Sequence, residues 1–177
     1  TTNIWIVGNT IISNADRGVQ LEGAGVDGNR VVSNTIDGMA RQDYGVRISD
    51  GDRNVVTNCF IRGHQLYGVS LSGDAASNTI VGNILRSNDT RGARMDGAGV
   101  YANRIIGNTI DSGASGNFQD YGVRIFDGDK NVVSNNVILG HSFYGVSISG
   151  DATSNKIVGN AIRSNDVYGV RVSGPAV

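Results

Sequence analysis

The stretch that decides the fold is Asn29-Arg30-Val31-Val32-Ser33-Asn34-Thr35-Ile36, which has asparagine at both ends of a short apolar run. Related phrases return about every 25 residues, and a short fixed period is the signature of a solenoid. The second asparagine of the successive phrases falls at Asn9, Asn34, Asn58, Asn83, Asn108, Asn135 and Asn160. We therefore predict about seven stacked coils that form one domain over residues 1–177.

A second phrase, glycine followed by alternating apolar residues, lies between successive asparagine phrases. Its glycines are Gly18, Gly45, Gly68, Gly92, Gly122, Gly145 and Gly169. Alternation of apolar residues and their β-branched character both indicate strands. From the asparagine phrase we expect two inward columns, Ile6, Val31, Val55, Ile80, Ile105, Val132 and Ile157, then Ile11, Ile36, Phe60, Leu85, Ile110, Val137 and Ile162.

The asparagine column has a physical explanation at a corner of each coil. Asparagine tolerates the left-handed conformation of a sharp bend, and its amide can donate to one neighbour in the column and accept from the other. A column present in every coil cannot mark a single site, so we predict a structural role. Cys59 aligns with Thr35 and Thr109, at an outward strand position.

A longer repeat overlies the short one. Segment 7–37 matches 81–111, and segment 42–89 matches 119–166, so three coils form a super-repeat. The longest departures from the stack are residues 38–42 and 112–119. Insertions on one face of a solenoid often carry its binding function.

Composition excludes several classes of function. A net charge of −1 removes the basic footprint of a nucleic-acid binder, and the single cysteine permits no internal disulfide. No apolar run approaches the roughly 18 residues of a membrane span, so we predict no membrane insertion. From the sequence as given we expect no signal peptide ahead of Thr1 and a coil left uncovered at each end. We expect an excerpt of a longer rod, or ends that stack on another copy.

The paired phrases Asn-x-Ile-x-x-Asn-x-Ile and Tyr-Gly-Val-x-Ile resemble the right-handed parallel β-helix repeats of the pectate-lyase-like superfamily. That superfamily includes NosD-type carbohydrate-associated repeats and the catalytic modules of mannuronan C-5 epimerases. The resemblance implies an all-β, right-handed parallel β-helix, an extracellular or periplasmic location, and a polysaccharide partner. The epimerase motif Tyr-Gly-Phe-Asp-Pro-His is absent, because Tyr-Gly is followed here by valine.

The outward column of the glycine phrase is rich in arginine. A guanidinium fork matches a carboxylate geometrically, so this column could bind a uronic-acid polymer along the rod axis. The candidate substrate-binding residues are Arg47, Ser70, Arg94, Asp96 and Arg124. The alternative is a solvated surface with its charges spaced to avoid one another.

His64 and His141 are the only histidines, and each precedes a tyrosine, Tyr67 or Tyr144. Such pairs could act as base and acid in abstracting the C5 proton of a uronate, the chemistry of lyases and epimerases in this superfamily. The alternative is a pair of corner histidines, because the super-repeat duplicates both. Strict alternation turns the tyrosine column toward the core, whereas exposed rings would stack on sugars.

Acidic turns recur at Asp50, Asp52, Asp127 and Asp129. Two carboxylates two residues apart can share a calcium ion, although aspartate is also ordinary in turns. Two functional hypotheses follow. The rod binds or processes an acidic polysaccharide, or it is a non-catalytic spacer, scaffold or assembly module.

Overall fold

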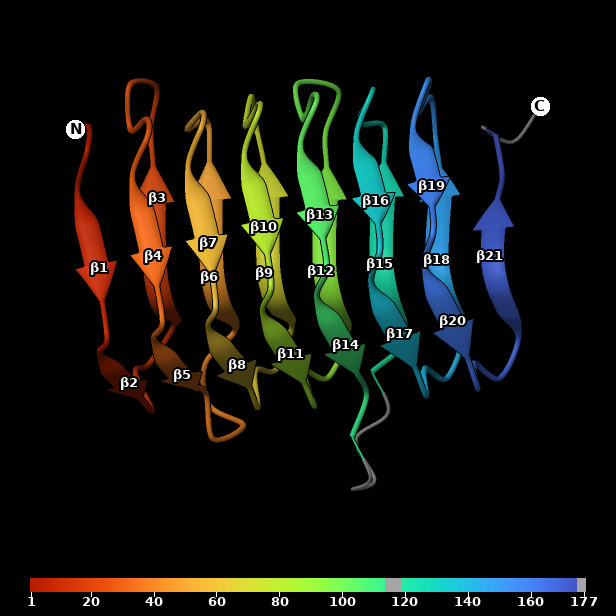
Figure 1. Cartoon of the computed structure of the whole chain (residues 1–177), viewed down its shortest axis with the longest axis horizontal. Coiled ribbons are helices and arrows are strands. Elements are labelled where there is room, and N and C mark those ends of the chain that lie inside the picture. Colours follow the sequence, from red (N-terminus) through yellow and green to blue (C-terminus); the bar gives the residue numbers. More distant parts are fainter. Residues whose placement is uncertain (114–118, 175–177) are drawn as a thin grey trace.

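The computed structural model describes residues 1–113 and 119–174, and over this part the chain forms seven coils of three strands (Figure 1). The first sheet contains β1 (Trp5–Val7), β4 (Arg30–Val32), β7 (Val55–Thr57), β10 (Thr79–Val81), β13 (Arg104–Ile106), β16 (Val132–Ser134) and β19 (Lys156–Val158). The second sheet contains β2 (Thr10–Ile12), β5 (Thr35–Asp37), β8 (Phe60–Arg62), β11 (Ile84–Arg86), β14 (Thr109–Asp111), β17 (Val137–Leu139) and β20 (Ala161–Arg163). The long-strand sheet contains β3 (Arg17–Glu22), β6 (Tyr44–Ser49), β9 (Tyr67–Ser72), β12 (Arg91–Asp96), β15 (Tyr121–Phe126), β18 (Tyr144–Ser149) and β21 (Tyr168–Val172).

Every strand pairs in parallel with the equivalent strand of the neighbouring coil. Ile80, for example, lies between Val56 and Ile105. The predicted parallel β-solenoid of about seven coils is confirmed. In the described part all regular elements are strands, and it contains no helix able to cross a membrane.

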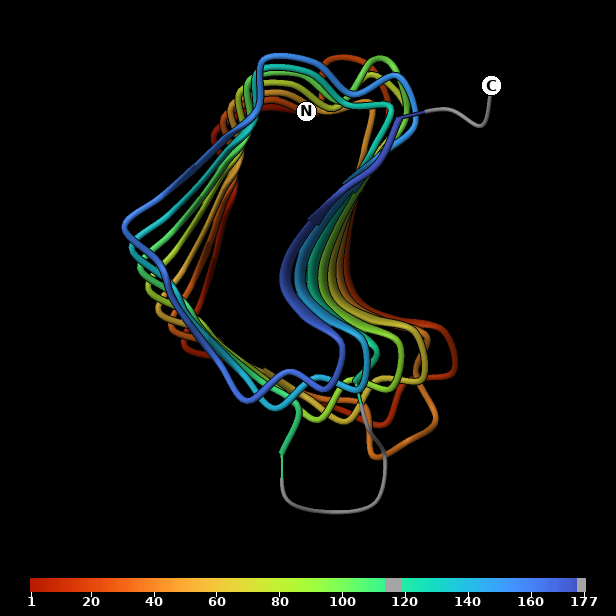
Figure 2. The same cartoon turned by 90° about the vertical axis from the view of Figure 1, so that its right-hand side faces the viewer.

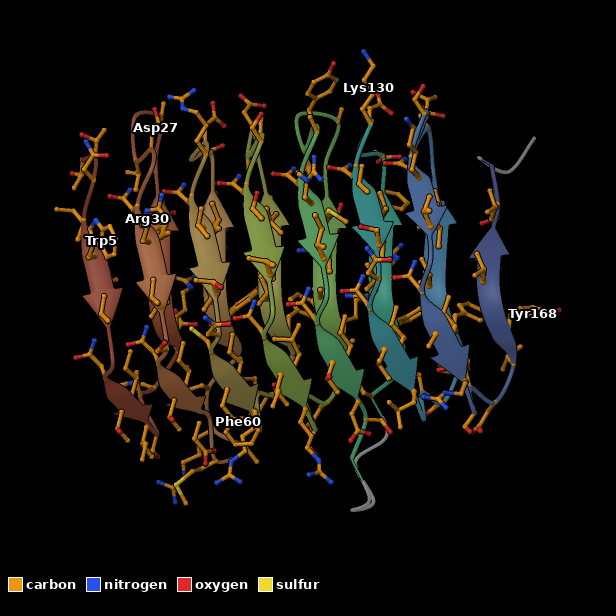
Figure 3. The ribbon with its side chains drawn as sticks, viewed as in Figure 1. Trp5, Asp27, Arg30, Phe60, Lys130 and Tyr168 are labelled. Atoms are coloured by element: carbon orange, nitrogen blue, oxygen red, sulfur yellow. The ribbon has the colours of Figure 1, made fainter. Side chains whose placement is uncertain are left out.

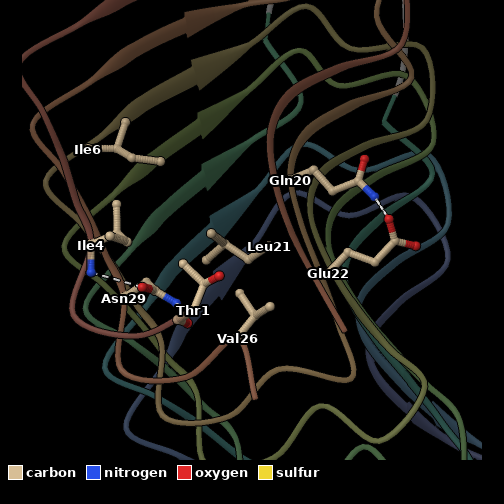
Figure 4. A pocket seen from close by; sticks show the side chains of 8 residues that line it. All are labelled: Thr1, Ile4, Ile6, Gln20, Leu21, Glu22, Val26 and Asn29. Carbon is tan, nitrogen blue, oxygen red and sulfur yellow. Dashed lines mark hydrogen bonds between the residues drawn. The ribbon is translucent and has the colours of Figure 1, made fainter. Parts of the chain in front are cut away.

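Inward side chains of the three sheets form continuous aliphatic columns with no exposed surface in the middle coils. The second sheet contributes Ile36, Ile61, Leu85, Ile110 and Ile138. Each coil thus buries its apolar face against the next coil. A single isolated coil could not bury this face. Figure 4 looks into the first coil, where Ile6 and Leu21 point into the interior.

The expected alignment of the third and sixth coils is wrong by one residue. Val56 and Ile61 are buried there, whereas Val55 and Phe60 face outward. The sixth coil likewise buries Val133 and Ile138 in place of Val132 and Val137. Because side chains alternate along a strand, a shift of one residue exchanges the inner and outer faces.

The asparagine column is present, but Asn58 and Asn135 do not belong to it. The column consists of Asn9, Asn34, Cys59, Asn83, Asn108, Asn136 and Asn160. Asn108 Oδ1 accepts from the backbone N–H of Asn83 at 2.9 Å and from its Nδ2 at 3.0 Å. Asn83 Nδ2 also donates to the Val56 carbonyl at 2.9 Å. Each amide therefore satisfies backbone groups that a bend would leave unpaired inside the rod.

The left-handed residue of this bend precedes the column asparagine, contrary to our expectation. This exposed corner column consists of Gly8, Ser33, Asn58, Gly82, Gly107, Asn135 and Gly159, all with positive φ. Asn58 has φ of 53° and Gly82 has φ of 65°. The bend needs a residue that tolerates this conformation, and the next position then points its side chain inward.

A second asparagine ladder lies where the long-strand sheet leads into the first sheet. It consists of Asn29, Asn54, Asn78, Asn103, Asn131 and Asn155. Asn78 Oδ1 accepts from the Asn54 N–H at 2.8 Å, and Asn54 Nδ2 donates to the Val26 carbonyl at 2.9 Å. Two of the three corners are thus held by the same interaction.

The third corner carries a buried column of mixed polar residues that includes both histidines. His64 is fully buried, and its Nδ1 lies 2.7 Å from Asn88 Oδ1, an oxygen that also accepts the His64 N–H at 3.3 Å. His141 has the same contacts with Asn165. Because the amide oxygen is the acceptor, Nδ1 carries the proton. Burial lowers the pKa of each histidine to about 4.

Replacing Cys59 with asparagine is expected to stabilise the protein by about 1 kcal/mol, the typical net value of a buried hydrogen bond. Cys59 Sγ is a weak partner for the Asn34 N–H at 3.5 Å, and it lies near the Val31 and Thr57 carbonyls that an amide would bond. Urea unfolding of Cys59→Asn measures the gain. Asn83→Cys, the reverse change one coil away, should lower the free energy of unfolding. A loss of stability in Cys59→Asn would contradict this account of the ladder.

The buried histidines predict that stability falls as the pH falls from about 6.5 towards 4. In this window the unfolded chain binds a proton at each histidine and the native state does not, so unfolding takes up protons and is favoured. With native pKa values of about 4, each histidine lowers the free energy of unfolding by roughly 2 kcal/mol between pH 7 and pH 5. Urea titrations of His64→Asn at both pH values should show about half of the histidine effect. We choose asparagine as the replacement because the neighbouring coil already has an asparagine, Asn88, at the equivalent position of this column. An unchanged pH dependence in this variant would contradict the assignment.

Candidate functional site

The outer face of the long-strand sheet carries three columns of polar and aromatic side chains in register. Tyr44, Tyr67, Arg91, Tyr121, Tyr144 and Tyr168 form the first column. Arg47, Ser70, Arg94, Arg124, Ser147 and Arg171 form the second, as predicted from the sequence. The third column contains Ser49, Ser72, Asp96, Phe126 and Ser149.

The expectation that the tyrosines turn toward the core is wrong, and the glycine that follows each tyrosine explains why. A Cβ on Gly45 would collide with the Ile61 side chain and the Gly68 carbonyl, so this glycine points inward. Val46, the next residue, is also fully buried. Two consecutive inward positions break the alternation and leave Tyr44 on the outer face, half-buried, with the Arg47 guanidinium 5.8 Å from its ring centre.

Tyrosine rings and guanidinium groups pack against one another along this face. The Tyr44 and Tyr67 ring centres are 5.4 Å apart, and those of Tyr121 and Tyr144 are 5.3 Å apart. Arg91 lies between the two pairs, 5.0 Å from the Tyr67 ring centre and 5.3 Å from that of Tyr121. Such stacks hold the guanidinium planes in fixed positions while their edges remain free to donate.

Positive charge concentrates in the fourth and fifth coils. Burial and the neighbouring cations Arg91 and Arg94 lower the pKa of Arg124, with Asp96 acting in the opposite direction. Asp96 forms an ion pair with Arg94, whereas Arg124 lies 4.8 Å from the Phe126 ring and makes no ion pair in the described part of the chain. An anion bound here would relieve this repulsion.

The remaining outward positions are less accessible. Ser70 is fully buried between the arginine-bearing coils, and its hydroxyl has no hydrogen-bond partner. Arg47 lies 3.9 Å from Glu22 of the preceding coil and is half-buried. Among the predicted substrate-binding residues, the arginines therefore present a row of guanidinium groups, and the buried Ser70 hydroxyl lies between Arg47 and Arg94.

The long-strand sheet is bowed toward the inside of the rod, so its outer face is concave (Figure 2). Residues 38–42 project at one end of these strands, with Met39 and Ala40 in the left-handed conformation. The other predicted excursion, residues 112–119, lies partly outside the described residues. A concave face with polar and aromatic columns along its length has the shape of a site for an extended polymer.

Of the four residues predicted for catalysis, Tyr67 and Tyr144 lie on this face, whereas His64 and His141 are in the interior at the third corner. The imidazole Nε2 of each histidine has no hydrogen-bond partner among the residues that the structure describes. The structure therefore does not bring the predicted base and acid together at the surface.

The aspartates predicted to bind calcium bond to backbone groups of the next coil. Asp50 Oδ1 accepts from the Asp74 N–H at 3.0 Å, and Asp52 Oδ1 accepts from the Ala76 N–H at 2.8 Å. Asp127 and Asp129 repeat these contacts with Asp151 and Thr153. Across residues 1–113 and 119–174, no group of three or more His, Cys, Asp or Glu side chains could hold a metal ion. These contacts are those of turn-capping carboxylates.

Several solved structures share the fold. The periplasmic alginate epimerase AlgG is 18% identical with a TM-score of 0.71, and the match covers 99% of this chain and 46% of AlgG. The AlgE4 A-module, a mannuronan C-5 epimerase of Azotobacter vinelandii, is 16% identical with a TM-score of 0.58, covering 98% of this chain and 57% of that one. Tailspike protein 2 of the Escherichia coli O157:H7 bacteriophage CAB120 is 17% identical with a TM-score of 0.66, and the match covers 82% of this chain and 20% of the tailspike chain.

At these identities the likeness extends to the fold alone, and the chain spans less than half the length of AlgG. No curated protein matches the sequence.

The sequence also matches the model of the family described as periplasmic copper-binding protein (NosD), over residues 1–97 and again over 67–175. Copper is bound by imidazole, thiolate and thioether groups, and the described residues do not assemble them. His64 and His141 are three coils apart, Cys59 lies at a different corner, and Met95 is within the core while Met39 is on an exposed turn. The donor set therefore does not fit a copper ion. Because the two matches together span nearly the whole sequence, the chain belongs to the NosD family.

Proposed function

We propose that the outer face of the long-strand sheet binds an acidic polysaccharide laid along the rod axis. The observation that carries the proposal is a column of tyrosine rings packed beside a column of guanidinium groups on a concave face. Equivalent positions in neighbouring coils repeat at about 4.8 Å, so an extended polymer meets the same columns at each coil. Rings offer stacking surfaces for sugars, and guanidinium forks offer paired donors to uronate carboxylates.

The fourth and fifth coils are the proposed centre of this site. Arg91, Arg94 and Arg124 lie close together there. Asp96 forms an ion pair with Arg94, and the charge of Arg91 also acts on the Asp120 carboxyl group. Burial and repulsion from Arg91 and Arg94 lower the pKa of Arg124, and a carboxylate of the polymer would offset both effects. Tyr67 and Tyr121 flank this centre and would contact the adjoining sugars.

Binding is the role we propose for the face, and the lyase or C-5 epimerase class is the enzyme class that such binding would serve. Because His64 and His141 are buried, their imidazoles cannot reach a substrate as the catalytic base unless the third corner opens. Tyr67 and Tyr144 remain as candidates for proton transfer. The family description and the AlgG likeness support an extracytoplasmic location, and the epimerase likeness supports a polysaccharide partner.

The regularity of the coils favours a second candidate, a non-catalytic spacer or scaffold. His64, Tyr67 and Asp50 each have an equivalent three coils later, at His141, Tyr144 and Asp127, so these candidate residues do not form one distinct constellation. Arg91 and Arg124 are duplicated in the same way, as Arg17 and Arg47, so among the central arginines Arg94 alone departs from the duplication, with Gln20 as its equivalent.

Affinity electrophoresis in gels that contain alginate tests the proposal. The double variant Arg94→Ala, Arg124→Ala removes two charge-assisted contacts and should weaken retention by about 10-fold to 100-fold. Arg104→Ala removes the same side chain from the first sheet and should be retained like the unmodified protein. If the unmodified protein migrates equally with and without alginate, the binding proposal is contradicted and the scaffold hypothesis is favoured. If incubation of alginate with the protein yields unsaturated sugars or a changed uronate composition, the protein also has lyase or epimerase activity.

A further inference from the structure

An uncharged ridge runs the length of the rod at the corner between the first and second sheets. It consists of the exposed corner column Gly8 to Gly159, the last residue of each first-sheet strand and the first residue of each second-sheet strand. None of these residues is charged. Val7, Ile84 and Val158 on the ridge are 49%, 45% and 57% exposed, and Phe60 also faces outward. The ridge thus mixes aliphatic residues with glycine and with uncharged Ser, Thr and Asn, and exposed apolar residues gathered on one face can mark an interaction site.

The ridge is convex and lies on the side of the coil opposite the long-strand sheet (Figure 2). Its corner residues are the outermost of the bend, and glycine occupies four of the seven corner positions. A convex rigid edge does not provide a pocket for a small molecule. It fits a surface that can deform around it.

One border of the ridge carries unpaired cations. Arg30, Arg104 and Lys156 share one column with Trp5 at the start of the first-sheet strands. All three cations are exposed and form no ion pair in the described part of the chain, and the Arg30 guanidinium lies 5.2 Å from the Trp5 ring. Figure 3 shows Trp5, Arg30 and Phe60 on this side of the rod.

The strands of the first sheet contain no acidic residue, although the whole chain has 16. The opposite border of the ridge, on the second sheet, carries two ion pairs and Arg163, an exposed cation with no ion pair among the described residues. Arg62 contacts Asp37 at 2.7 Å, and Arg86 contacts Asp111 at 3.5 Å. Unpaired charge beside the ridge is therefore positive, which selects an anionic partner.

We propose that this ridge adsorbs to an anionic lipid surface, with its aliphatic residues among the headgroups and Arg30, Arg104 and Lys156 against the lipid phosphates. Aliphatic and tryptophan side chains beside a row of cations are the combination by which interfacial helices bind such surfaces. A second copy of the same face would bring three cations against three cations. A lipid surface deforms around a convex edge, whereas a rigid protein would need a matching groove.

This orientation has a consequence for the polysaccharide face. The rod would lie along the membrane surface, with the long-strand sheet turned away from it (Figure 2). The polysaccharide would then be held at a fixed distance from the lipid, and both ligands would bind at once. The adsorption proposal does not depend on polysaccharide binding, because the two faces share no residue.

Co-sedimentation with lipid vesicles tests the proposal. Vesicles of phosphatidylglycerol and phosphatidylcholine in equal amounts should bind the protein at low salt, whereas phosphatidylcholine alone should bind it weakly. Arg104→Glu should lower the affinity for the anionic vesicles at least about fivefold, the effect of one basic residue near such a surface. Raising the salt concentration should reduce binding, because screening shortens the range of the attraction. Ile84→Ser should also weaken binding without changing the salt dependence.

Arg41→Glu is the matched control, because Arg41 is an exposed arginine on the 38–42 turn, away from the ridge. It changes the net charge by the same amount as Arg104→Glu and should leave vesicle binding unchanged. Thermal melts of each variant confirm that it folds. Equal losses for the two variants would overturn the proposal in favour of a general charge effect. Absence of binding to the anionic vesicles would also overturn it and leave the ridge as a surface for a protein partner. Arg94→Ala with Arg124→Ala should bind vesicles normally, which separates this test from the polysaccharide test.

Discussion

The structure depends on one interaction, the hydrogen bond between a backbone N–H at a bend and the side-chain oxygen of the asparagine one coil further on. A solenoid with short strands must turn three times per coil, and each turn removes backbone groups from the sheet ladders. Inside the rod these groups have no access to water, and an unpaired one is costly. Asn83, Asn108 and their equivalents pair these groups and link each coil to the next. The coils can therefore stack in register with few long turns.

Core packing and the outer surface are coupled through the glycine of the long strands. Gly45 approaches Ile61 and the Gly68 carbonyl so closely that no side chain fits, and Val46 also points inward. The same geometry turns Tyr44 outward beside Arg47. A requirement of the interior thus arranges the aromatic column that we propose for sugar binding. The charge of this face comes mainly from Arg91 and Arg124, which repeat Arg17 and Arg47 of the super-repeat, and from Arg94, which replaces Gln20.

The two proposed surfaces differ in shape as well as in charge. The long-strand sheet is concave, with arginines held by tyrosine rings, and suits an extended polymer. The corner between the two short-strand sheets is convex and uncharged, with cations on one border, and suits a deformable surface. Both arise because a stack of coils converts each position of the repeat into a column along the rod. A residue type that recurs at one position becomes a property of a whole face.

The sequence by itself determined the solenoid, because the period and the alternation of apolar residues both require neighbouring coils to bury one face. It also determined which residues share the arginine column, since these follow the glycine at a constant distance. Register in the third and sixth coils needed the tertiary structure, because Asn58-Cys59 and Asn135-Asn136 each offer two adjacent corner positions and only packing chooses between them. The tertiary structure also decided which face the tyrosine side chains point to and that His64 and His141 are buried. Each depends on how closely neighbouring coils approach, and that distance is not a property of the local sequence.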